Sequence, residues 1–309
     1  MRRAAVIDIG SNSIKALVAT RDAAGGLQAL VQKTEDARIS RGISQAEPRL
    51  TEEEMQRGLD AVRVLLEVIR PYEPDSLTLV ATSAVRDAHN GAEFADRIAT
   101  LAGQPLRVLS GAEEAELIGR GMRCDPALAD ARDFYVFDLG GGSLECLSFQ
   151  DGTLRQSTSL PLGCVRLTER FVADPARPLL PAEDLAIRTH VRTTLAAGFS
   201  FDLGVQPAVF AGGSMTSVRL MLAAAAGVEL AEVSAQVSVA TLTATFRHLA
   251  ALPLAEREIV PGLPARRADV MPTALATILT LAEGAGFEDF QHSFYNLRWG
   301  LAARALQLV

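Results

Sequence analysis

The sequence predicts an α/β fold built from two related domains, and three observations carry this prediction. The chain has 309 residues, of which 49% are hydrophobic, so it can bury more core than one ordinary domain holds. A short motif, a strand ending in Asp followed by a Gly- and Ser-rich turn, stands at residues 6–14 and returns at residues 136–144. In each half this repeat leads into strands and then into helices, which is typical of a mixed sheet flanked by helices.

Each copy of the repeat predicts a β-hairpin that opens an antiparallel meander. The two copies are VIDIGSNSI, residues 6–14, and VFDLGGGSL, residues 136–144. Apolar runs on both sides of a tight turn predict two paired strands. A polar turn then precedes a third strand in each half, at Leu27–Val31 and at Leu154–Leu160.

Helices and further strands follow the meander in the first half. Thr51 and Glu54 have the spacing of a capping box at the start of an amphipathic helix, which Pro71 ends. Ser110 and Glu113 form a second capping box, before a helix that runs to about residue 123. Between these helices the pattern predicts two short strands and a helix, at Leu77–Ala81, Leu106–Leu109 and Gly91–Leu101.

The domain boundary is predicted from a change in composition. Residues 124–133 are rich in Asp and Ala, contain Pro126 and form the expected crossing. The first domain is therefore assigned to residues 1–124 and the second to residues 125–290. The terminal segment, about residues 291–309, is expected to return to the first domain. In the second half a strand is expected at Pro207–Phe210, with helices at Pro181–Ala197, Ser214–Ala226, Ser238–Leu252 and Ala268–Ala285, and the terminal helix at about Leu297–Leu308.

Charge and composition exclude several classes of protein. A formal net charge of −7 does not favour nucleic acid or an anionic membrane as a partner. The longest apolar stretch, Leu220–Val228, is far below the roughly 20 residues that span a bilayer, and the N-terminal apolar run is too short for a secretory signal. Cys124, Cys146 and Cys164 lack the short spacings of a zinc site or a disulfide framework. We therefore expect a soluble, cytoplasmic protein with reduced thiols.

The two Gly- and Ser-rich loops have the composition of a phosphate-binding site. Glycine lets the backbone close on phosphate oxygens, and serine hydroxyls can donate as well. Asp8 and Asp138 each end a strand beside a loop and are hard oxygen ligands suited to Mg2+, and Glu145 shares a strand face with Ser143. One Asp-x-Gly hairpin is often only a structural turn. Two matching acidic loops, however, can clamp one phosphate group between two domains.

Further positions are candidates for binding an anion. Lys15 shares a strand face with Ser13, so its ammonium can neutralise a phosphate or pair with an acidic neighbour. The turn at residues 212–214 precedes a helix whose free amides suit an anion, although a plain tight turn explains it nearly as well. Arg266 and Arg267 are interpreted as a solvated surface pair rather than as part of a basic track.

Together these motifs resemble the exopolyphosphatase and guanosine pentaphosphate phosphohydrolase (Ppx/GppA) family in its short two-domain form. The stretches Ala81–Ala88, Ser110–Ala115 and Ala211–Ser214 also fall in the order of that family. The resemblance implies two ribonuclease H-like domains of the actin, Hsp70 and sugar kinase superfamily, with the active site in the cleft between them. It also implies that the protein forms a homodimer.

The resemblance implies a role for each candidate residue. Glu114 is implied to be the catalytic base that orients water for in-line attack, with Mg2+ or Mn2+ as the cofactor. The expected metal ligands are Asp8, Asp138 and Glu145. The expected substrate contacts are Ser11, Asn12, Ser13, Lys15, Arg86, Gly140, Gly141, Gly142, Ser143, Gly212, Gly213 and Ser214. Without the resemblance, Glu113 and Glu114 would simply complement the helix dipole and Arg86 would be a solvated loop residue.

The expected activity is release of terminal phosphate from linear inorganic polyphosphate by Mg2+-assisted hydrolysis. The alternatives are hydrolysis of guanosine pentaphosphate and a noncatalytic sensor of guanosine tetraphosphate or pentaphosphate. A kinase is a third alternative, but the sequence has no acceptor-site motif. Two departures from the family pattern, Arg41 and the segment Asn296–Gly300, leave the details of the substrate open. Longer family members carry additional helical domains, so we expect weaker gripping of long polymers here.

Overall fold

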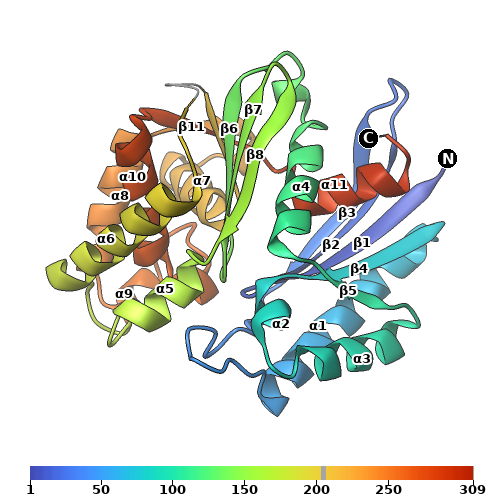
Figure 1. Ribbon diagram of the computed structural model, residues 1–309, viewed down its shortest axis with the longest axis horizontal. Coiled ribbons are helices and arrows are strands. Elements are labelled where there is room, and N and C mark those ends of the chain that lie inside the picture. The colour runs from blue at the N-terminus through green and yellow to red at the C-terminus, as the bar shows by residue number, and fades with distance from the viewer. Residues whose placement is uncertain (203–206, 309) are drawn as a thin grey trace. The chain divides into compact units, whose positions relative to one another are not determined.

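The computed structural model describes residues 1–202 and 207–308, and the chain divides into two compact units. The first unit comprises Met1–Asp130 and Tyr295–Val309, and the second comprises Ala131–Phe294. Residues 203–206 and 309, which the sequence-based domain assignment includes, lie outside the described residues. Each unit holds one β-sheet with helices packed on it (Figure 1), so the predicted α/β class is confirmed.

The sheet of the first unit has the strand order β3-β2-β1-β4-β5. The first three strands form the predicted antiparallel meander, and the last two run parallel to β1. The strands are β1 (Arg3–Ile9), β2 (Ile14–Arg21), β3 (Leu27–Glu35), β4 (Ser76–Ala81) and β5 (Leu106–Val108). Strand β1 lies at the centre and is apolar along most of its length, as expected for a strand covered on both faces.

Four longer helices and three short elements complete the first unit. The longer helices are α1 (Glu52–Ile69), α3 (Gly91–Ala102), α4 (Gly111–Met122) and α11 (Leu297–Ala305), and the short elements are α2 (Ser83–Asp87) and the 3-10 turns Arg70–Tyr72 and Pro126–Leu128. Both predicted capping boxes are present, at Thr51 with Glu54 and at Ser110 with Glu113. The terminal helix ends at Ala305, a few residues earlier than predicted.

Two glycines allow α4 and α11 to pack backbone against backbone. A Cβ atom on Gly300 would overlap the carbonyl oxygen of Leu117 in α4. A Cβ atom on Gly121 would overlap the carbonyl oxygen of Asn296, just before α11. This close crossing fixes the position of α4, the helix that carries Glu114.

The sheet of the second unit repeats the order of the first. Its strands lie in the order β10-β11-β9-β6-β7-β8. When this order is read from β8, the third strand of the meander, the strands β8-β7-β6-β9-β11 correspond one by one to β3-β2-β1-β4-β5 of the first unit. The strands are β6 (Phe134–Leu139), β7 (Leu144–Gln150), β8 (Thr153–Leu160), β9 (Ala208–Ala211), β10 (Gln236–Ser238) and β11 (Asp289–His292). The repeat seen in the sequence is therefore a repeat of topology.

The helices of the second unit are more numerous than the sequence suggested. They are α5 (Cys164–Phe171), α6 (Pro181–Gly198), α7 (Gly213–Ala226), α8 (Val239–Ala251), α9 (Leu254–Arg257) and α10 (Met271–Ala285), with 3-10 turns at Leu230–Glu232 and Ala265–Arg267. Helix α10 begins at Met271 rather than at the predicted Ala268, because residues 268–270 form a turn that continues from the 3-10 turn Ala265–Arg267. No helix in the described part of the chain has the length and apolar character needed to cross a bilayer.

A buried Arg–His pair lies in the second unit, where α7 packs beside the end of β11. The Arg219 guanidinium donates to Nδ1 of His292 at 3.0 Å and to the carbonyl oxygens of Leu230 at 3.1 Å and Val233 at 2.6 Å. Because a guanidinium can only donate, Nδ1 must accept, and the ring is neutral with its proton on Nε2, 3.2 Å from Thr216 Oγ1. Burial, and then the charge of Arg219, lower the pKa of His292 to about 3.

This pair predicts a loss of stability in acid. The pKa of His292 in the folded protein lies below its ordinary value of 6.5, so the unfolded chain takes up the proton first. The stabilising contribution is complete above pH 6.5 and is lost as the pH falls toward 3. As the pH falls from 6.5 to 4, the free energy of unfolding of wild type should decrease by about 3 kcal/mol more than that of His292→Gln. Urea denaturation at each pH measures this difference. The exposed His248, replaced by Gln, is the control, and parallel curves for wild type and His292→Gln would contradict the prediction.

Candidate active site

The two Gly- and Ser-rich loops are the same backbone turn. Gly10 N donates to Ser13 O at 3.2 Å in the first unit, and Gly140 N donates to Ser143 O at 3.0 Å in the second. Within the described residues, the amides of residues 11–13 and 141–143 donate to no protein acceptor. Unpaired amides on a largely buried turn are costly unless a ligand accepts from them, so both loops are suited to an anion.

Strand register places a different partner beside each loop aspartate. Asp8 lies opposite Lys15 across β1 and β2, whereas Asp138 lies opposite Glu145 across β6 and β7. Directly opposed residues share a sheet face, with Cβ atoms about 5 Å apart. The first unit therefore sets opposite charges side by side, and the second unit sets two carboxylates side by side.

The paired carboxylates of the second unit fit a divalent cation. Glu145 is 2% exposed, and its Oε1 accepts from Ser159 Oγ at 2.7 Å. Oδ1 of Asp138 lies against Gly212, where a Cβ atom would be only 2.8 Å away, and the φ of Gly212 is 97°. Like charges held together in a site with little water are unfavourable without a cation between them. Carboxylate oxygen is also the ligand that Mg2+ prefers.

In the first unit, one oxygen of the Asp8 carboxylate lacks a hydrogen-bond partner among the described residues. This oxygen, Oδ1, is buried. Burial raises the pKa of Asp8, while the charges of Lys15 and Arg298 act in the opposite direction. Asp8 lies in the first unit, while Asp138 and Glu145 lie together in the second. No group of three or more His, Cys, Asp or Glu side chains able to hold a metal occurs among the residues described. Phosphate oxygens or water would therefore have to complete an octahedral shell.

The neighbouring acids Glu113 and Glu114 have separate environments. Glu113 is partly exposed and holds the helix cap, where its Oε2 accepts from Ser110 N at 2.9 Å. That hydrogen bond, together with one from Arg107, lowers the pKa of Glu113 to about 2. Glu114 is turned inward, 6% exposed, and its Oε2 accepts from Arg86 NH1 at 2.9 Å.

Arg86 is an ordered residue and not the solvated loop arginine that the residue alone, without the resemblance, would suggest. The same NH1 also donates to Leu109 O at 3.0 Å, and the side chain is only 23% exposed. Arg86 lies in α2, a helix of five residues that is too short to leave a periodic signal. Its position beside Glu114 allows it to orient one oxygen of that carboxylate.

Ser83 was not singled out from the sequence, although it lies beside the first loop. Its hydroxyl is 2.9 Å from the hydroxyl of Ser11, and both side chains are buried. Ser83 begins α2, so this contact connects the first loop to the helix that carries Arg86. The one available signal was its place in the stretch Ala81–Ala88, which matched the family order.

The turn at Gly212, Gly213 and Ser214 begins α7, as predicted, and Arg267 lies on it. The Arg267 guanidinium occupies the space where a Cβ atom of Gly213 would be, and its NH2 donates to Ser214 Oγ at 3.2 Å. Arg267 is 9% exposed, and its Nε is buried with no partner in the described residues. The interpretation of Arg267 as solvated is therefore wrong, whereas Arg266 is exposed. The 3-10 turn at Ala265–Arg267 directs one arginine inward and one outward.

Arg267 adds a cation to a helix N-terminus that is already positive. A guanidinium and free first-turn amides attract the same ligand, an anion. The second unit therefore brings together its loop, its carboxylate pair and this arginine-bearing turn. The first unit brings together Asp8, Lys15 and its own loop, and connects them through Ser83 and Arg86 to Glu114.

The comparisons with known proteins cover both units. A model of the Ppx/GppA phosphatase family matches residues 17–307. An exopolyphosphatase from Cytophaga hutchinsonii has a TM-score of 0.89 at 22% identity, over 100% of this chain and 99% of that chain. The Aquifex aeolicus member of the Ppx/GppA family has a TM-score of 0.79 at 23% identity, over 99% and 98% of the two chains. An exopolyphosphatase-like protein has a TM-score of 0.87 at 25% identity, over 98% and 97%. These likenesses confirm the predicted fold.

Proposed function

Because the chain belongs to the Ppx/GppA phosphatase family and is a phosphohydrolase, we propose that it releases terminal phosphate from linear inorganic polyphosphate with the aid of Mg2+. The observation that supports this proposal most is the presence of two matching loops with unpaired amides, each beside a buried carboxylate. A linear phosphate chain carries negative charge on every phosphate group, so both loops can bind its phosphate groups.

Glu114 is the residue proposed to activate water. Arg86 donates to Oε2 of Glu114 and so orients the carboxylate, which is proposed to accept a proton from a water molecule aimed at the terminal phosphorus. A carboxylate that is held by a neighbour and shielded from bulk solvent keeps the geometry that in-line attack needs. Glu113 takes no part, because its carboxylate caps the helix.

The anionic substrate is proposed to be neutralised by the loops and by nearby cations. The amides of Ser11–Ser13 and of Gly141–Ser143 donate to phosphoryl oxygens, and Gly140 closes its turn. Lys15, Arg86 and Arg267 add positive charge. The buried position of Arg267 makes it a fixed charge rather than a mobile surface one.

Asp138 and Glu145, together with Asp8, are proposed to hold Mg2+ or Mn2+. When bound, the metal would polarise the phosphoryl group and offset its negative charge. Ser159 orients Glu145 for this task through its 2.7 Å hydrogen bond. Cytoplasmic localisation and homodimer formation stay predictions from the family resemblance.

Guanosine pentaphosphate is the second candidate substrate, and Arg267 is the observation that favours it. The arginine-bearing start of α7 is an anion site separate from the loop of the same unit. A linear polymer can be held by the loops alone, but a nucleotide with phosphates on two sides of its ribose has a second anionic group to place. The start of α7 is thus proposed to hold either a further phosphate or the guanosine end.

Phosphate release from short polyphosphate, long polyphosphate and guanosine pentaphosphate, with Mg2+ and with a chelator, tests the proposal. We expect metal-dependent release, and we expect Asp138→Asn to raise the Mg2+ concentration for half-maximal rate by about tenfold or more. Asp130→Asn is the matched control, because Asp130 is exposed and has no described role. Phosphate release at the same rate with the chelator as with Mg2+ would contradict the metal assignment. Binding of guanosine tetraphosphate without hydrolysis of any substrate would instead indicate a noncatalytic sensor.

A further inference from the structure

The carbonyl oxygens of both loops are bonded by the segment that follows the third strand of the same unit. In the second unit, Gly140 O accepts from Cys164 N at 3.0 Å, and Gly141 O accepts from Val165 N at 2.9 Å. These amides belong to the first turn of α5, which needs acceptors. In the first unit, Ser11 O accepts from Ile39 N at 3.1 Å. Each loop is therefore held from its carbonyl side.

Holding a carbonyl also directs the next amide. In a trans peptide the C=O of one residue and the N–H of the following residue point in opposite directions. A bond to the carbonyl of Gly141 thus turns the amide of Gly142 away from α5, and a bond to the carbonyl of Gly142 does the same for Ser143. The unpaired amides of each loop are set by what binds its carbonyls.

One arginine in each unit completes this arrangement. Arg166 N donates to Gly141 O at 3.1 Å, and Arg166 Nε donates to Gly142 O at 2.9 Å. Arg38 N donates to Asn12 O at 3.0 Å, and Arg38 Nε donates to Asn12 Oδ1 at 3.3 Å. Both arginines follow the third meander strand and use the same two donors, the backbone amide and Nε. They lie at similar but not identical distances along the chain, 26 and 24 residues after the residues that their Nε atoms bond. The Nε acceptor is the Asn12 side chain in the first unit and the Gly142 backbone carbonyl in the second.

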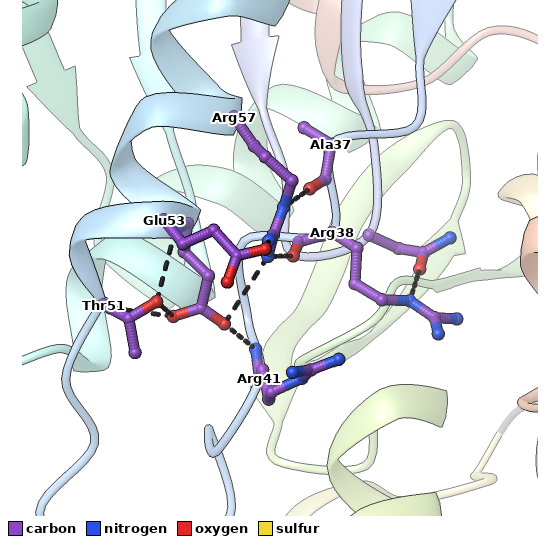
Figure 2. Close-up of polar contacts among 8 residues, drawn as sticks. Ala37, Arg38, Arg41, Thr51, Glu53 and Arg57 are labelled. Atoms are coloured by element: carbon purple, nitrogen blue, oxygen red, sulfur yellow. Dashed lines mark hydrogen bonds and ion pairs between the residues drawn. The ribbon is translucent and has the colours of Figure 1, made fainter.

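Arg38 keeps this position in a backbone conformation that favours glycine. Its φ is 42°, which costs an ordinary residue about 1 kcal/mol or more. Helix α1 holds it there: Arg57 Nε donates to Ala37 O and Arg57 NH2 to Arg38 O, each at 3.1 Å, while Glu54 Oε1 accepts from Arg41 N at 3.0 Å (Figure 2). The side chain of Arg38 therefore reaches Asn12 Oδ1 from a strained backbone that contacts with α1 stabilise.

In the second unit, a glycine allows helix α5 to approach the loop closely. A Cβ atom on Gly163 would overlap the backbone of Gly141 and Gly142, so α5 can approach the loop only with glycine at this position. Helix α5 has no side-chain cap, because the loop itself supplies the acceptors. The loop and the start of α5 therefore form one structural element, with Arg166 at its edge.

From these contacts we infer that Arg38 and Arg166 are equivalent positioning residues, which hold the two loops so that the loop amides stay directed at a phosphate group. The inference rests on the proposed function, since it takes the loops as the phosphate-binding elements. It assigns the arginines a directional role, through hydrogen bonds to the loops, in addition to their charge. The predicted consequence is loss of anion affinity without loss of the fold.

Calorimetric titration of tripolyphosphate with Mg2+, in full-length protein carrying Glu114→Gln to prevent turnover, tests the role of Arg166. We expect Arg166→Ala to raise Kd about tenfold or more, the effect of losing hydrogen bonds worth about 1.4 kcal/mol. Arg166→Lys keeps the charge but not the Nε–H donor, and should not restore affinity. Arg170→Ala, on the exposed side of the same helix, should bind like the parent. The thermal midpoint should change no more in Arg166→Ala than in this control.

In the first unit, Arg38→Gly tests the contribution of the Arg38 side chain separately from that of its backbone. Glycine accepts the left-handed conformation and keeps the amide bond to Asn12 O, so only the guanidinium is lost. Kd should still rise several-fold, with the exposed Arg63→Ala as the control. Unchanged affinity in Arg166→Ala and Arg38→Gly, or full rescue by Arg166→Lys, would overturn the inference. If the wild type releases no phosphate from any substrate, the proposed function fails, but reduced tripolyphosphate binding in these variants would still support the positioning role.

Discussion

Replacing Glu114 by glutamine is expected to lower kcat by about 10²- to 10⁴-fold while tripolyphosphate still binds. The amide oxygen of glutamine can still accept the hydrogen bond from Arg86, so the local geometry is kept. It cannot accept a proton from water, and this is the step for which Glu114 is proposed. Steady-state phosphate release gives kcat, and calorimetry with tripolyphosphate gives Kd in the same protein.

Glu113→Gln is the matched control for this experiment. The two residues are adjacent in α4, but the carboxylate of Glu113 is partly exposed and bonded to the Ser110 amide. The amide oxygen of glutamine can still accept from the Ser110 amide, so the helix cap should be kept and kcat should change by less than about threefold. A wild-type kcat in Glu114→Gln would show that Glu114 is not the catalytic base. Loss of tripolyphosphate binding in that variant would instead assign Glu114 to substrate binding.

The features predicted correctly from sequence are those whose determinants lie close together in the chain. A hairpin is specified by two apolar runs and the turn between them, so both meanders could be placed from residues 6–14 and 136–144. A capping box is specified within four residues, and both predicted boxes are present. The correspondence of the two sheets followed because the same local signal occurs twice.

The features that sequence reasoning missed depend on contacts between distant segments. The inward position of Arg267 depends on the turn at Gly213 and on a hydrogen bond to Ser214, 53 residues earlier in the chain. Helix α5 has no side-chain cap because its acceptors belong to the loop at Gly140 and Gly141, so no local start signal exists. Likewise, the pairing of Arg86 with Glu114 joins residues 28 positions apart. No periodicity or spacing rule reports such contacts.

Replacing Gly300 by alanine is expected to destabilise the first unit by about 3 kcal/mol. The added methyl group would overlap the carbonyl oxygen of Leu117, a backbone atom that cannot rotate away, so α11 and α4 would have to move apart. Trp299 is the single tryptophan of the chain and is buried in α11, so its fluorescence reports this part of the first unit directly. Urea denaturation followed by that fluorescence measures the loss.

Gly284→Ala supplies the control, because Gly284 lies in α10 with nothing within 4 Å of an added Cβ atom. Alanine is the better helix former, so this variant should be unchanged or stabilised by up to about 1 kcal/mol, measured by circular dichroism. Since α4 carries Glu114, separation of the two helices in Gly300→Ala should also displace the carboxylate and reduce kcat in the molecules that remain folded. Wild-type stability together with wild-type kcat in Gly300→Ala would mean that the helix crossing is looser than the structure shows, and that the position of Glu114 is fixed by Arg86 and the cap of α4 instead.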